Sequence, residues 1–140
     1  MERLYPIGIQ NFEDLRRNGY IYVDKTALIH RLVRTGKYYF LGRPRRFGKS
    51  LMISTLEAYF QGKRELFKGL DIEKLEKEWT VRPVLHLDLN SRNYNGIESL
   101  KAILNQHLEK WEKMYGCEKQ NRAPEERFAY IIEHAAKQTG

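Results

Sequence analysis

The sequence has little cysteine and no long apolar run. Its single cysteine, Cys117, excludes an intrachain disulfide and a metal cluster built on cysteines. The first residues lack the apolar core of a signal peptide, and no apolar run approaches the length of a membrane span. We therefore expect a cytoplasmic protein that makes no contact with a membrane.

Histidine is also scarce. The four histidines are His30, His86, His107 and His134. They lie far apart in the sequence and share no spacing typical of metal ligands. His107 falls on the apolar face of an expected helix and His86 within an expected strand, so both are interpreted as packing residues.

The composition predicts one folded, basic domain. The 140 residues suffice for a core, and 41% hydrophobic with 12% aromatic residues argues against disorder. Lys and Arg number 25 against 18 Asp and Glu, which gives a net charge of +7. This surplus favours nucleotides, nucleic acid or acidic surfaces as partners and does not choose among them. The basic residues concentrate in residues 43–49 and are otherwise spread along the chain.

The segment at residues 43–50 is similar to a phosphate-binding P-loop, whose pattern is glycine, four residues and then Gly-Lys-Ser/Thr. Arg43 stands where the pattern has its first glycine. Gly48 lacks a Cβ and lets the backbone approach a phosphate, and Lys49 can bridge the β and γ phosphates. The hydroxyl of Ser50 is suited to Mg²⁺. The candidate nucleotide-binding residues are Arg43, Pro44, Arg45, Arg46, Phe47, Gly48, Lys49 and Ser50. Lys49 is also the catalytic candidate, and the expected cofactors are ATP and Mg²⁺.

The flanks of this loop predict a strand before it and a helix after it. Residues 38–41 form a short aromatic and apolar run, and apolar residues recur at helical spacing up to about Gln61. The other expected helices span residues 25–35, 71–79, 97–115 and 124–139, with Asp24 as the N-cap of the first; residues 1–23 are expected to be irregular. Residues 84–89 form a second expected strand. Strands separated by helices predict an α/β fold with a parallel sheet.

Asp88 lies at the carboxyl end of the second expected strand. Ligands gather at such ends in α/β sheets, so Asp88 is a second candidate for the Mg²⁺ site. The alternative is a polar residue that is hydrogen-bonded in a loop.

Four segments resemble the start of the bacterial predicted AAA-ATPase-like family. They are residues 6–12, 22–26, 39–50 and 85–88, and the Arg-Pro-Arg-Arg-Phe-Gly-Lys-Ser loop is the most specific of them. That family tolerates a residue other than glycine at the first loop position, as at Arg43. The resemblance covers nearly the whole chain and implies a P-loop NTPase-like parallel sheet with flanking helices. Relatives often continue into a restriction-endonuclease-like module.

The resemblance further implies that residues 1–140 are the N-terminal portion of an AAA-ATPase-like domain that stops before its Walker B strand. Residues 1–36 would be an N-terminal segment and helix, and residues 37–140 a fragment of the P-loop core. Because the usual water-activating acid would then be missing, we expect weak or undetectable hydrolysis by this chain alone. Missing strands would also leave sheet edges exposed, so we expect either that the two strands pair directly with each other or that the chain associates with itself.

The leading hypothesis is ATP binding through a Walker A-type loop, as part of an ATPase. Two alternatives stay open. One is a nucleic-acid module in which the basic residues of the loop contact a phosphate backbone, with nucleic acid as a partner through the parent protein. The other is a regulatory module with a vestigial loop.

Overall fold

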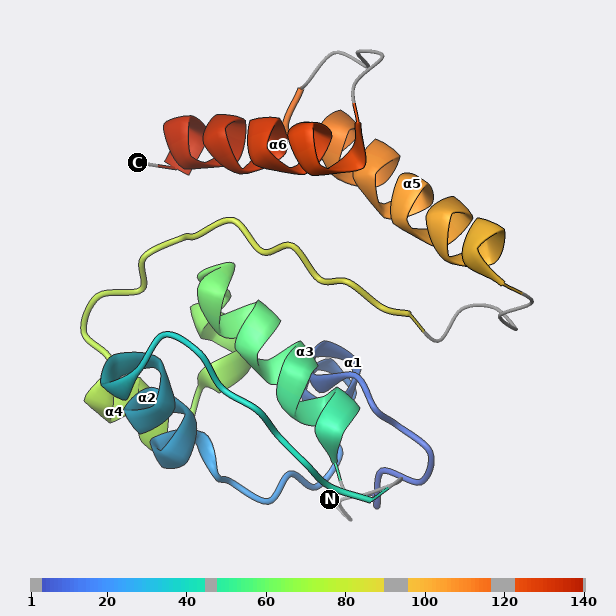
Figure 1. Cartoon of the computed structure of the whole chain (residues 1–140). Coiled ribbons are helices and arrows are strands. Elements are labelled where there is room, and N and C mark those ends of the chain that lie inside the picture. The colour runs from blue at the N-terminus through green and yellow to red at the C-terminus, as the bar shows by residue number, and fades with distance from the viewer. Residues whose placement is uncertain (1–3, 45–47, 90–95, 117–122, 140) are drawn as a thin grey trace. The chain divides into compact units, whose positions relative to one another are not determined.

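All regular secondary structure is helical in the ranges that the computed structural model describes, residues 4–44, 48–89, 96–116 and 123–139. The elements in chain order are α1 (Phe12–Arg17), α2 (Thr26–Thr35), α3 (Lys49–Phe60), the 3₁₀ turn η1 (Arg64–Phe67), α4 (Asp71–Leu75), α5 (Ile97–Met114) and α6 (Pro124–Thr139) (Figure 1). The chain divides into two compact units, Met1–Arg82 and Pro83–Gly140. None of the described helices combines the length and apolarity that crossing a bilayer requires.

The expected α/β fold with a P-loop NTPase-like parallel sheet is wrong, because no described range contains a strand. In the first expected strand, Tyr38 and Phe40 are 93% and 95% exposed, whereas a parallel strand is covered on both faces. The hydroxyl of Tyr39 instead donates a hydrogen bond to the carbonyl oxygen of Leu32 in α2. In residues 84–89, Leu87 and Leu89 are exposed as well. The short apolar run therefore has no regular secondary structure in either place.

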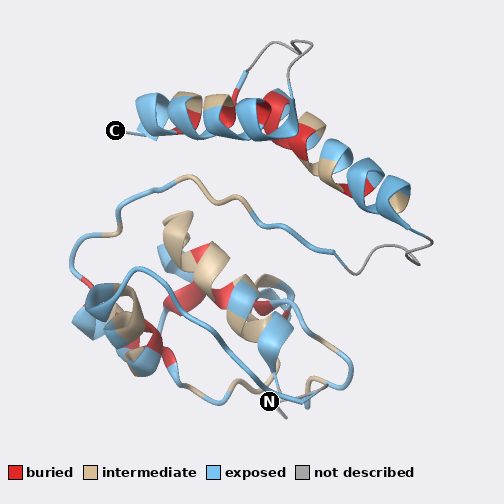
Figure 2. Ribbon diagram, viewed as in Figure 1, coloured by how far each residue is buried: buried red, intermediate tan, exposed pale blue. Residues whose placement is uncertain are grey.

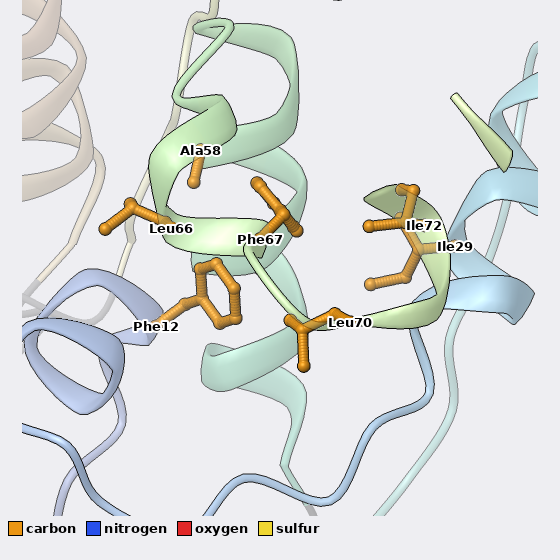
Figure 3. Packing of buried hydrophobic residues seen from close by; sticks show 7 residues of the cluster. All are labelled: Phe12, Ile29, Ala58, Leu66, Phe67, Leu70 and Ile72. Atoms are coloured by element: carbon orange, nitrogen blue, oxygen red, sulfur yellow. The ribbon is translucent and has the colours of Figure 1, made fainter. Parts of the chain in front are cut away.

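The core of the first unit forms where α1, α2, α3, η1 and α4 meet. Its buried side chains are Phe12, Ile29, Ala58, Leu66, Phe67, Leu70 and Ile72 (Figure 3). Phe67 is fully buried, and its ring centroid lies 4.8 Å from that of Phe12 and 5.2 Å from that of Trp79. This cluster fixes α3 against α1.

Helix α1 occupies residues that we expected to be irregular. Asn11 caps it, because its side chain accepts a hydrogen bond of 3.1 Å from the backbone N–H of Asp14. Acidic residues in the first turn and basic residues in the last turn suit the helix dipole. The burial of Phe12 and Leu15 supplies the packing that so short a helix needs.

Asp24 links the starts of α2 and α4. The helix expected over residues 25–35 begins at Thr26, and one carboxylate oxygen of Asp24 accepts a hydrogen bond of 2.9 Å from the Thr26 N–H. The other oxygen accepts a bond of 2.8 Å from the N–H of Asp71 at the start of α4. Burial acts to raise the pKa of Asp24, but these bonds outweigh it and hold the pKa below its ordinary value. The ionised carboxylate thus joins two helices.

The second unit packs α5 against α6. The buried residues of this interface are Leu108, Trp111, Tyr115, Ile131 and Ala135, and Leu85 packs against them. In Figure 2 the buried residues of both helices are interspersed with exposed ones, as expected of amphipathic helices. Glu112 and Arg127 form a buried ion pair across the interface, with 2.6 Å between Oε1 and Nε.

Candidate functional site

The candidate site is built on the turn that leads into α3. Gly48 precedes the helix with φ of +80° and ψ of 16°, in the left-handed region that glycine adopts without strain. A Cβ at this position would meet nothing within 4 Å, so the backbone there is also open to an approaching group. Any other residue would be strained at this φ whatever the space around it.

The start of α3 has features that favour the binding of an anion. Gly48 offers no side chain to cap the helix, and the first turn contains no acidic residue. The first N–H groups of an α-helix have no partner within the helix, and the helix dipole adds partial positive charge there. Lys49 places an ammonium group on the same turn. Backbone donors and a side-chain cation therefore coincide, which is the chemistry that binds phosphate.

A cavity of about 560 Å³ opens at this turn. Its walls come from two segments of the first unit, residues 8–10 and residues 48–51. Ser54 ties the segments together, because its Oγ accepts a hydrogen bond of 2.9 Å from the N–H of Phe12. The same Oγ lies 3.3 Å from the carbonyl oxygen of Gln10 and 2.9 Å from that of Leu51. The wall opposite the helix start is thus held in place by α3 itself.

The structure brings some of the predicted site residues together. Gly48, Lys49 and Ser50 line this cavity and are exposed. Arg43 lines a neighbouring cavity to which Gly48 also contributes, and Pro44 is exposed before the turn. Arg45, Arg46 and Phe47 lie outside the described residues.

Asp88 belongs to the other unit, and each unit is described by itself. There its backbone oxygen lies 2.9 Å from Nε2 of His107, whose ring is 5.7 Å from that of Trp111. His107 therefore lies on α5 beside Trp111, which is part of the buried interface with α6. The assignment of Asp88 to the Mg²⁺ site therefore stays a prediction.

The sequence did not indicate that three residues of the cavity wall belong to the site. These residues are Gly8, Ile9 and Gln10. Their segment was part of the family resemblance, but nothing in its residue types indicates phosphate binding. Gly8 has φ of +74° and allows the turn that this wall makes. The signal that could have found the wall is a turn glycine two residues after Pro6, in a segment shared with the family.

The described residues contain no group of three or more His, Cys, Asp or Glu side chains that could hold a metal ion by themselves. Mg²⁺ commonly keeps several waters and binds through one or two protein groups together with phosphate oxygens. The hydroxyl of Ser50, in the first turn of α3, fits that mode of binding.

Comparisons with known proteins agree with the earlier resemblance. The family model described as Predicted AAA-ATPase matches residues 6–140. The chain therefore belongs to this family of predicted AAA-ATPases. An uncharacterized protein from the vnfD 5' region of Azotobacter chroococcum mcd 1 is 37% identical over 132 residues. That match covers 93% of this chain and 25% of the relative, so the chain spans about a quarter of the relative's length. No solved structure matches the chain.

Proposed function

We propose that this chain binds ATP with Mg²⁺ at the start of α3, through a Walker A-type loop that includes residues 43–50. The observation that carries the proposal is the cavity at an uncapped helix start whose first turn presents Lys49 and Ser50. The family's description as a predicted AAA-ATPase supports a nucleotide as the anion.

Each residue has a distinct task in this proposal. Gly48 keeps the entrance free of a side chain, so that phosphate oxygens can reach the backbone N–H groups. Lys49 neutralises phosphate charge, and Ser50 offers its hydroxyl to Mg²⁺. The metal would supply charge neutralisation on the phosphate oxygens. Asp88 stays a second candidate ligand, to be tested by Asp88→Asn.

The Lys49→Ala variant tests the proposal. Loss of a charge-assisted contact is expected to weaken MgATP binding by about 10- to 100-fold. Because Lys49 is exposed, the unfolding temperature should stay unchanged. The matched control is Lys74→Ala, an exposed lysine in α4 of the same unit that does not line the cavity. Equal affinities of the two variants in calorimetric titration would refute the site.

A nucleic-acid module is the second candidate, favoured by the net charge of +7 and by the exposure of Arg43 and Lys49. Duplex DNA would then bind with an affinity that falls steeply with salt. DNA binding that persists in saturating MgATP supports this candidate, whereas displacement of DNA by MgATP supports the nucleotide site. Self-association stays an expectation that light scattering can measure.

A further inference from the structure

A second cavity, of about 370 Å³, lies in the first unit beside the helix start. Apolar side chains from three parts of that unit line it: Leu28 and Leu32 of α2, Met52 of α3, and Ile21 and Val23 before α2. Its volume falls within the roughly 300–1,000 Å³ typical of small-molecule sites, which are mostly apolar with few polar groups. A cavity of this kind suits a flat, weakly polar group.

The two cavities adjoin at the turn into α3. Gly48 and Leu51 line both of them. One cavity offers backbone donors and Lys49, and the other offers an apolar wall. A ligand with an anionic end and an apolar end could therefore occupy both at once, and a nucleotide is such a molecule.

The polar groups of the second cavity are few and fixed. The ring of Tyr22 is held edge-on by Phe12, with 5.3 Å between the ring centroids. The hydroxyl of Thr55 donates a hydrogen bond of 2.7 Å to the carbonyl oxygen of Leu51. Burial raises the pKa of Tyr22, and its hydroxyl is hydrogen-bonded to Thr55 within the protein. An aromatic ring among apolar side chains suits a heteroaromatic ring that packs against it.

We infer that this second cavity holds the nucleobase of the nucleotide whose phosphates bind at the start of α3. The inference rests on the proposed function and adds the part of the ligand that the sequence left unassigned. Arg43 and Lys25 also line this cavity and add positive charge to it.

The test compares ATP with inorganic tripolyphosphate, which has the phosphates but no base, on the intact 140-residue chain. Wild type is expected to bind MgATP at least about tenfold more tightly than magnesium tripolyphosphate. The double variant Leu28→Gln/Leu41→Gln makes the apolar wall polar at positions that are 63% and 38% exposed, so folding should persist. It should lose about tenfold in ATP affinity and leave tripolyphosphate affinity unchanged. The matched control is Leu4→Gln/Leu75→Gln, at positions that are 62% and 45% exposed and line neither cavity.

The outcomes separate the two claims. Equal affinities of wild type for ATP and tripolyphosphate, or equal losses in the test and control variants, would overturn the base cavity while leaving the phosphate site intact. Failure of both ligands to bind wild type would overturn the proposed function and, with it, this inference.

Discussion

Phe67→Ala is expected to lower the free energy of unfolding of the unit Met1–Arg82 by about 3–5 kcal/mol. The Phe67 side chain is fully buried between Phe12 and Trp79, and the helices around it leave the cavity little room to collapse. Chemical denaturation followed by Trp79 fluorescence in a Trp111→Phe background measures this unit alone, because the chain has two tryptophans, one in each unit.

The matched control for this prediction is Ile53→Ala. Ile53 lies on α3 and is 42% exposed, so its truncation leaves no closed cavity. MgATP binding should weaken in Phe67→Ala as the unit unfolds and should persist in the control. Similar destabilisation by both substitutions would contradict the core described here.

Glu112→Ala is expected to destabilise the unit Pro83–Gly140 by about 3–5 kcal/mol. The side chains of Glu112 and Arg127 are 6% and 9% exposed, and Arg127 also donates a hydrogen bond to Asn105. Within the described residues, Nη2 of Arg127 is already buried without a hydrogen-bond partner. Removing the carboxylate would leave this guanidinium buried without its counter-charge. Chemical denaturation followed by Trp111 fluorescence in a Trp79→Phe background measures this loss of stability.

An exposed ion pair provides the control for Glu112. Glu133 and Lys137 lie 2.9 Å apart on α6 with side chains that are 60% and 69% exposed, and solvent screens such pairs. Glu133→Ala should leave the unfolding midpoint unchanged. If Glu133→Ala destabilises the unit as much as Glu112→Ala does, the effect of Glu112→Ala does not come from the burial of the Glu112–Arg127 pair.

The amphipathic helices were the part of the fold that the sequence could predict. Helices expected over residues 97–115 and 124–139 are present as α5 (Ile97–Met114) and α6 (Pro124–Thr139), because an apolar face repeating at helical spacing is a local property. The N-cap of α2 was misplaced by one residue: it is Lys25 and not Asp24, although the Asp24 carboxylate does accept a hydrogen bond from the Thr26 N–H. Helix α1 was missed although Asn11 and the acidic residues after it are start signals.

The strands could not be predicted because a strand needs neighbours. The aromatic run at residues 38–41 has the composition of a buried strand, but Tyr39 bonds back to α2 and Phe40 is exposed. Within the site, the residue types near Gly48 indicated phosphate chemistry. The cavity walls at residues 8–10 depend on the packing of Ser54 between distant segments, which no local pattern encodes.

Backbone amide NMR of the chain, with and without MgATP, tests the location of the nucleotide most directly. The account predicts that the amide signals of Gly48, Lys49 and Ser50 shift strongly with MgATP, remain unchanged with MgCl₂ alone, and lose their response in Lys49→Ala. Shifts confined to Pro83–Gly140, or no shifts at saturating nucleotide, would contradict it.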